Sequence, residues 1–176
     1  MKPRLARRPF FALSLVLMLT LSASTISSNP RTTANGDAGK AMQELKLLDL
    51  DGKPYDAAKL KGSVLVLDFW ATWCKPCINE IPELNRLQEK YASKGLKVVG
   101  VTMASGAAPE VKPFVGRFKM QYTVLMGDDG QSYDLNIYSY PTTYLVTRDW
   151  KVRAIYKEAG PRKTRDLEAE ILKLLD

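Results

Sequence analysis

Histidine is absent from all 176 residues of this chain, and cysteine occurs only twice. Without histidine there is no Ser-His or Cys-His nucleophile system, and there is no imidazole ligand for zinc or haem. Two cysteines are too few for a four-thiolate zinc site, and the second is followed by isoleucine rather than by the histidine of a haem-attachment sequence. These absences leave Cys74 and Cys77 as the candidates for chemistry, with no metal site expected.

Acidic residues are also missing from the first 23 residues, which hold four basic residues. The whole chain has a net charge of +7, but removing these four from 26 basic residues leaves 22 against 19 acidic residues, about +3. A balance that small does not indicate a nucleic-acid partner. The 45% hydrophobic and 26% charged composition is that of one globular domain.

The N-terminus has the pattern of an export signal. Residues 1–23 combine a basic start with an apolar run over 10–21, which is shorter than the roughly 20 apolar residues of a spanning helix. We expect either a cleaved signal peptide or a short retained anchor, with export by the general or the twin-arginine route, since Arg7 and Arg8 are paired. Residues 24–40 are polar and predict a flexible leader before a folded domain at 41–176.

From residue 42 onward, apolar runs typical of strands alternate with amphipathic stretches typical of helices. The predicted strands lie at 42–55 (a short strand and turn), 63–70, 96–103, 121–127, 141–147 and 151–158. The predicted helices lie at 78–91, 109–120 and 162–176. This order predicts an α/β fold, with a central mixed sheet flanked by helices and a closing hairpin and helix.

The stretch "FWATWCKPC" places Cys74 after a strand, at the start of a helix. There, free backbone N–H groups and the helix dipole favour a thiolate, and Lys75 adds a positive charge. Cys77 lies one turn later on the same helix face, close enough for a disulfide, and we expect it to be the more buried sulfur. Pro76 is tolerated because N–H groups of a first turn lack helical partners.

Three interpretations of this cysteine pair remain open. A structural disulfide is disfavoured because a four-residue loop constrains little unfolded-chain entropy. A two-thiolate site for copper or mercury, as in a metallochaperone, has suitable soft ligands but no supporting methionine cluster or histidine. Redox exchange is favoured, since Cys-x-x-Cys at a strand-to-helix junction of an α/β pattern is typical of thiol–disulfide chemistry.

"LDLDGKPYDAAKLKGSVLVLDFWATWCKPC" and "YPTTYLVTRDWKV" resemble the thioredoxin-fold family, in its exported TlpA/ResA-like branch. That branch includes the thioredoxins of cytochrome c maturation, and the resemblance covers residues 42–176. It implies a thioredoxin-like fold with an N-terminal strand extension and a central βα insert between the strand at 96–103 and "YTVLMGDDG".

The resemblance also implies roles for particular residues. Cys74 would attack substrate disulfides and Cys77 would resolve the mixed disulfide. Pro141 would be a cis-proline facing the disulfide, and Tyr140 before it would offer backbone groups to a substrate. Three residues around the nucleophile complete the expected substrate-binding surface: Trp73, Lys75 and Pro76.

Two acids are further catalytic candidates. Asp68 stands where many TlpA/ResA-like proteins have Asn. Beneath the helix N-terminus it would be desolvated, its pKa would rise, and it would exchange a proton with Cys77. Glu80 matches a glutamate near the active site of ResA-like proteins, although on a helix surface it would be merely solvated. The chain departs from the family at "YSY" before Pro141 and at Trp150, which replaces a turn glycine.

These features predict an extracytoplasmic protein-disulfide oxidoreductase acting as a reductant, with no cofactor beyond its own disulfide. The expected partners are protein thiols and disulfides, with apocytochrome c as the best single substrate, and a membrane-bound electron donor. We expect a monomer. A peroxidase of the redoxin group is the remaining alternative, but Ala71 occupies the position where that chemistry needs threonine.

Overall fold

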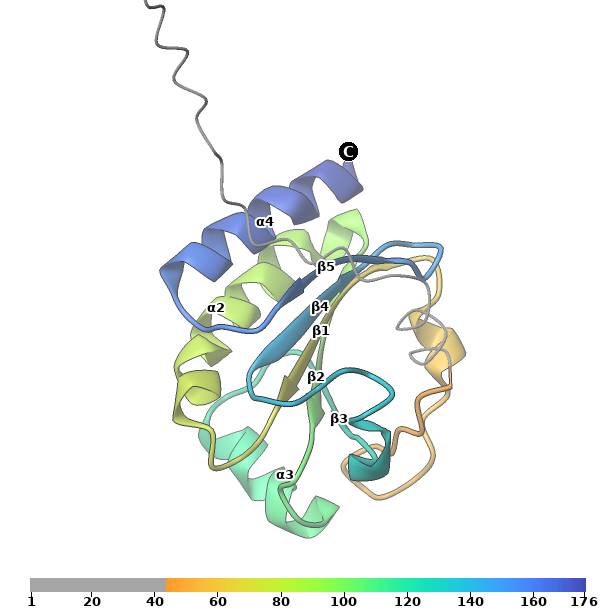
Figure 1. Ribbon diagram of the computed structural model, residues 1–176, viewed down its shortest axis with the longest axis vertical. Helices are drawn as coiled ribbons and strands as arrows, with labels where there is room; N and C mark the ends of the chain where they lie inside the picture. The colour runs from red at the N-terminus through yellow and green to blue at the C-terminus, as the bar shows by residue number, and fades with distance from the viewer. Residues whose placement is uncertain (1–43) are drawn as a thin grey trace, which may run out of the picture.

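A computed structural model describes residues 44–176 (Figure 1). The elements are η1 (Ala57–Leu60), β1 (Val64–Trp70), α2 (Lys75–Tyr91), η2 (Ala92–Lys94), β2 (Leu96–Thr102), α3 (Ala108–Arg117), β3 (Thr123–Met126), η3 (Asp129–Gln131), β4 (Thr142–Val146), β5 (Val152–Tyr156) and α4 (Pro161–Leu175), where η marks a 3-10 helix. The five-stranded sheet has the order β3-β2-β1-β4-β5. The expectations for residues 1–23 and 24–40 lie outside the described residues.

The sheet is mixed, as predicted. β1 pairs in parallel with β2 and antiparallel with β4, β2 pairs in parallel with β3, and β4 and β5 form an antiparallel hairpin. The thioredoxin-like α/β fold expected from the sequence is therefore confirmed. In the part of the chain that the structure describes, no helix is both long and apolar enough to span a bilayer.

β1 is buried along its whole length and divides the core into two clusters. Its even-numbered apolar residues join a cluster with the helices: Val64, Val66 and Trp70 with Leu84 and Leu87 of α2, Val111 of α3, and Leu167 and Ile171 of α4. Its odd-numbered residues join a cluster on the other face. Because side chains alternate along a strand, Asp68 faces the helical side, the side that also contains both cysteines.

The second face of the sheet is covered by irregular chain rather than by a long helix (Figure 1). The predicted strand within 42–55 is reduced to isolated bridges from Leu48 to Pro54 and to Met126. The segment turns back at Gly52, whose φ is 76°, and Pro54 has no N–H for a ladder. The N-terminal extension therefore forms backbone pairing with β3 through one residue, Leu48.

Trp150, where the resemblance implied a turn glycine, has a φ of 64° in the β4–β5 hairpin, which lies in the left-handed region that favours glycine. Its side chain is buried in the cluster on the face away from the helices. The strained backbone is thus accompanied by burial of a large indole, and Trp150 lies away from the cysteines rather than on a substrate surface.

Glu168 of α4 ties that helix to α2. Its carboxylate accepts hydrogen bonds from Arg86 Nη2 at 2.5 Å, Lys90 Nζ at 3.0 Å and Tyr91 Oη at 2.6 Å. Hydrogen bonding from Arg86, followed by Tyr91 and Lys90, lowers the pKa of Glu168 to about 2. Its side chain is 21% exposed, so solvent screens the cluster only in part.

Replacing Glu168 with Gln is expected to destabilise the fold by about 2 kcal/mol at pH 7. The folded-state pKa lies below the unfolded value, so the stabilisation is present above about pH 4.5 and is lost as the pH falls toward 2. Urea unfolding at pH 7 and near pH 2 measures the difference. Glu89→Gln, an exposed glutamate of α2, is the matched control. An equal loss at both pH values would show that ionisation of Glu168 is not the cause.

Candidate active site

Cys74 and Cys77 form a disulfide at the start of α2, with their Cα atoms 5.3 Å apart. Cys74 is the N-cap of the helix, and the backbone N–H of Cys77 donates to its Sγ at 3.3 Å. This places the Cys74 sulfur at the positive end of the helix dipole, as the sequence predicted. The two cysteines are 4% and 2% exposed, so the expected difference in burial has the predicted direction but is small.

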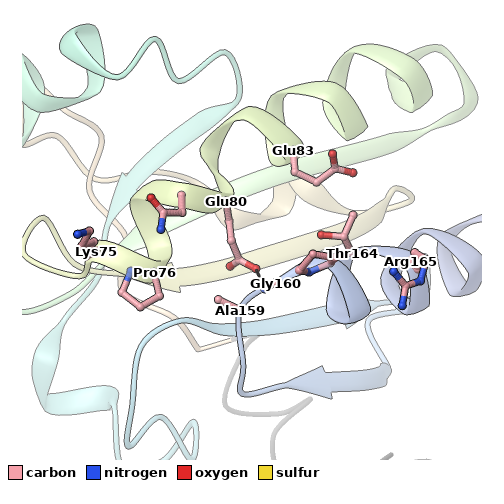
Figure 2. A pocket seen from close by; sticks show the side chains of 10 residues that line it. Lys75, Pro76, Glu80, Glu83, Ala159, Gly160, Thr164 and Arg165 are labelled. Carbon is pink, nitrogen blue, oxygen red and sulfur yellow. Dashed lines mark hydrogen bonds between the residues drawn. The ribbon is translucent and has the colours of Figure 1, made fainter.

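The first turn of α2 borders a pocket of about 720 Å³ between the starts of α2 and α4 (Figure 2). Lys75 and Pro76 line it from α2, and Ala159 and Gly160 line it from the loop before α4. Lys75 and Pro76 are both exposed. Figure 2 shows the Glu80 carboxylate directed toward Gly160 at this pocket. Two of the expected substrate-binding residues thus lie beside an open hollow next to the disulfide.

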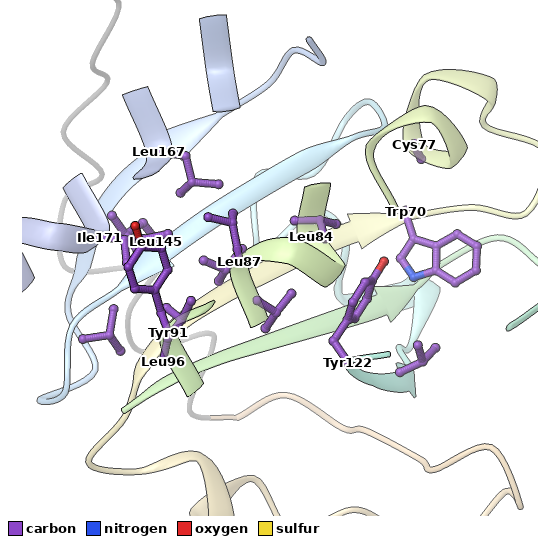
Figure 3. Packing of buried hydrophobic residues seen from close by; sticks show 14 of the residues in the cluster. Trp70, Cys77, Leu84, Leu87, Tyr91, Leu96, Tyr122, Leu145, Leu167 and Ile171 are labelled. Atoms are coloured by element: carbon purple, nitrogen blue, oxygen red, sulfur yellow. The ribbon is translucent and has the colours of Figure 1, made fainter. Parts of the chain in front are cut away.

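Asp68 is only 1% exposed, and it faces the side of the sheet whose buried cluster includes Cys77 and Trp70 (Figure 3). Its Oδ1 accepts a hydrogen bond of 2.5 Å from Thr143 Oγ1, the second threonine of the "PTT" motif. Desolvation by burial raises the pKa of Asp68, as expected. The predicted burial of this acid is confirmed, and its exchange of a proton with Cys77 stays a prediction.

Glu80 is not a solvated helix-surface acid. It is 7% exposed, and its Oε2 lies 2.6 Å from Lys163 Nζ, while the N–H of Gly160 donates to its Oε1 at 3.2 Å. Desolvation raises its pKa, and the ammonium of Lys163 acts in the opposite direction. The sequence placed Glu80 near the active site but not in an ion pair, because the partner lies 83 residues away.

The aromatic residues expected at the substrate surface come together from two loops. Trp73 is 66% exposed, and its ring meets that of Tyr140 edge-on with the ring centroids 5.8 Å apart. The indole N–H of Trp73 donates to the carbonyl of Ala104 at 2.9 Å. The Tyr140–Pro141 bond is cis, as the resemblance implied, and Pro141 is buried. The "YSY" segment, which departs from the family pattern, thus places the ring of Tyr140 beside that of Trp73.

Residues 37–171, most of the chain, match the Redoxin family. The chain belongs to the redoxin family. The thioredoxin-like protein YneN of Bacillus subtilis is 33% identical over 135 residues, which are 76% of this redoxin and 78% of that protein. The thiol-disulfide oxidoreductase ResA of Bacillus thuringiensis is 33% identical over 138 residues, or 77% and 78% of the two chains.

A solved structure of a putative thiol:disulfide interchange protein DsbE from Chlorobium tepidum matches this redoxin with a TM-score of 0.68 and 29% identity. The match covers 75% of this redoxin and 94% of the Chlorobium chain. Together with the ResA relatives and the Cys74–Cys77 disulfide, it shows that this redoxin is a ResA-like thiol–disulfide oxidoreductase of the thioredoxin type.

Sequence reasoning missed one residue of this site, Lys163 in the first turn of α4. It is 2% exposed and reaches both Glu80 and Asp68. A signal was present: Lys163 precedes Leu167 and Ile171 at steps of four residues, so it lies on the apolar stripe of the helix. A lysine on a buried face needs an acidic partner, which this redoxin supplies twice.

Proposed function

We propose that this redoxin is an extracytoplasmic reductant of protein disulfides in which Cys74 attacks and Cys77 resolves. The observation that carries the proposal is the Cys74–Cys77 disulfide at the N-terminus of α2. In the reduced protein the Cys74 thiolate would attack a substrate disulfide and release one substrate thiolate. Cys77 would then attack Cys74, release the second substrate sulfur and restore the internal disulfide, with no further cofactor.

Asp68 and Glu80 are the proposed proton acceptors for Cys77. The thiol of Cys77 is buried and must lose its proton to act as a nucleophile. Asp68 lies on the same face of the sheet as Cys77, and Glu80 lies one turn after Cys77 on α2. Both acids have pKa values raised by burial, which brings their proton affinity closer to that of a thiol.

The exposed surface around the disulfide is the proposed binding site for protein thiols and disulfides. Trp73 and Tyr140 offer apolar ring surface, and Lys75 and Pro76 extend it across the first turn of α2. Tyr140 and Pro141 lie in the loop before β4, from which backbone groups of Tyr140 would pair with an extended substrate segment. Such a surface suits a peptide of a partly unfolded substrate.

The proposed location is the outer face of the cytoplasmic membrane or the periplasm. The basic and apolar pattern of residues 1–23 supports export, with a short anchor over 10–21 if the segment is retained. A reductant in an oxidising compartment needs a source of electrons, so a membrane-bound donor is the proposed partner. We propose apocytochrome c as substrate and a monomeric enzyme.

A glutathione redox titration of the Cys74/Cys77 pair tests the direction of exchange. Potentials in this fold run from about −270 mV for reductants to about −120 mV for oxidants. We expect a midpoint more negative than about −200 mV, and the reduced enzyme should open a disulfide-bonded Cys-x-x-Cys-His peptide. A midpoint near −120 mV would show that the enzyme is an oxidant instead.

A further inference from the structure

Lys163 joins two carboxyl groups that come from different elements. Its Nζ lies 2.6 Å from Glu80 Oε2 on α2 and 3.7 Å from Asp68 Oδ1 on β1. Within residues 44–176 it is the one cation recorded within 4.0 Å of either carboxyl group. Burying an ammonium group costs free energy unless the group is paired, and the two carboxyl groups provide that pairing for Lys163.

The three groups do not balance in charge. With both acids ionised, one ammonium faces two carboxylates in a buried site. Desolvation is the main cause of the raised pKa of Glu80, and the Coulomb interaction with Asp68 adds to it. The other polar groups around them are the Thr143 hydroxyl from β4, the Gly160 N–H before α4, and the phenol of Tyr122, whose pKa these two acids help to raise. None of these carries a positive charge. Lys75, Glu83 and Arg165 also line the Glu80 pocket. Among the described residues, only Lys163 forms an ion pair with Asp68 and Glu80, so it is the main cation that favours their ionisation.

The two carboxyl groups differ in their access to water. Asp68 is enclosed, whereas Glu80 lines the pocket between the starts of α2 and α4 (Figure 2). Lys163 lies between them and bridges an acid beneath the active-site helix to one at a solvent-open hollow. A proton that reaches the enclosed Asp68 therefore has a second carboxyl group nearby, Glu80, at the wall of the pocket.

We propose that Lys163 is a positioning residue that holds Asp68 and Glu80 together as one negatively charged couple, and that this couple takes the proton of Cys77 in the resolving step. The inference rests on the proposed function. In that step the Cys77 S–H proton passes to a carboxylate of the couple, and the Cys77 sulfur forms a bond to Cys74. The bond between Cys74 and the substrate sulfur breaks, and that sulfur leaves as a thiolate with the electron pair. In this step the Cys77 sulfur is oxidised to the disulfide level and the departing substrate sulfur is reduced to a thiolate, while the Cys74 sulfur stays at the disulfide level.

Replacing Lys163 with Met keeps most of the length of the unbranched side chain and removes its charge. Without the ammonium, the two acids retain their protons to higher pH, so fewer carboxylates accept the thiol proton at a given acidic pH. The acid limb of the resolving rate is expected to move up by about one pH unit, which is about a tenfold slower rate at pH 6.

The experiment uses the reduced enzyme and the disulfide reagent DTNB in a stopped-flow instrument. Attack by Cys74 releases one nitrothiobenzoate, and attack by Cys77 on the mixed disulfide releases the second in a later phase. The rate of the second phase is measured from pH 5 to 9 for the wild type, Lys163→Met, Lys163→Arg and Lys173→Met. Lys173 pairs with the buried Glu170 at 2.8 Å on the same helix and is the matched control.

We expect the acid limb of the pH–rate profile to move to higher pH in Lys163→Met. In Lys173→Met it should coincide with the wild type, and in Lys163→Arg it should return toward the wild-type position because the positive charge is kept. An unmoved limb in Lys163→Met, or an equal displacement in all three variants, overturns the role of Lys163. If the wild type releases no second nitrothiobenzoate, the proposed function itself fails, which is a separate result.

Removing a buried cation can also unfold the chain, because it leaves an uncompensated carboxylate. A second comparison reduces this loss, because one carboxylate is removed together with the cation: Glu80→Gln alone against Glu80→Gln with Lys163→Met, in which Asp68 is the one acid of the couple that remains. We expect the limb of the double variant to lie above that of Glu80→Gln by about one pH unit. Coincident limbs would overturn the proposal.

Discussion

Replacing Cys74 with Ser is expected to abolish protein-disulfide exchange, with a loss of at least about a thousandfold. A serine hydroxyl at the start of α2 stays protonated at neutral pH, so it gives neither the thiolate nucleophile nor a mixed disulfide. The turbidity assay of insulin reduction by dithiothreitol measures the loss. Trp73, Tyr140 and the pocket lining are left in place, so the variant separates chemistry from substrate binding.

Cys77→Ser is the matched variant for this prediction. It keeps the N-cap thiol of Cys74 and removes only the resolving sulfur, so the enzyme should accumulate a mixed disulfide with its substrate. Mass spectrometry of the trapped adduct checks the assignment. Insulin reduction by Cys74→Ser at the wild-type rate, or an adduct on Cys77 in that variant, would contradict the assigned order of attack.

Replacing Asp68 with Asn is expected to change activity and stability in opposite directions. Asparagine keeps the shape and accepts the hydrogen bond from Thr143, but it takes no proton. Loss of a positioned acid or base costs about a hundredfold in rate, so we expect resolution by Cys77 to slow by that factor near pH 7.

The stability of the same variant follows from the pKa of Asp68, which burial raises above its unfolded value. The folded state then binds this proton more tightly than the unfolded state, so the stability due to Asp68 is greatest below about pH 4 and falls as the pH rises through the folded pKa. Asp68→Asn removes that fall, and we expect it to be more stable at pH 8 by on the order of 1 kcal/mol.

Urea unfolding at pH 8 and at pH 3 checks the sign, with Asp134→Asn at an exposed position as the control. The gain should be present at pH 8 and absent at pH 3. A variant that is less stable than the wild type at pH 8 would show that Lys163 and Thr143 fully compensate the buried carboxylate. A variant with the wild-type resolving rate would remove Asp68 from the proton transfer.

Much of the fold was predictable because its signals are local. The continuous apolar run of β1, the three- and four-residue steps of α2 and the turn before β5 each depend on neighbours in the chain. The extension at 42–55 was the exception. Its residues have strand composition, but Gly52 and Pro54 stop the ladder after one residue, so Leu48 makes only bridges.

By itself the sequence determined the chemistry of this redoxin. No histidine, two cysteines at i and i+3, and a strand leading into a helix favour thiol–disulfide exchange over a structural disulfide or a soft-metal site, because the position of Cys74 at a helix N-terminus follows from local structure. The tertiary structure alone decided the environment of the acids. Glu80 and Lys163 are 83 residues apart, and they meet with Asp68 only because α4 packs across β1 and α2. Burial and pairing depend on that packing, so local sequence patterns could not predict that Glu80 pairs with Lys163.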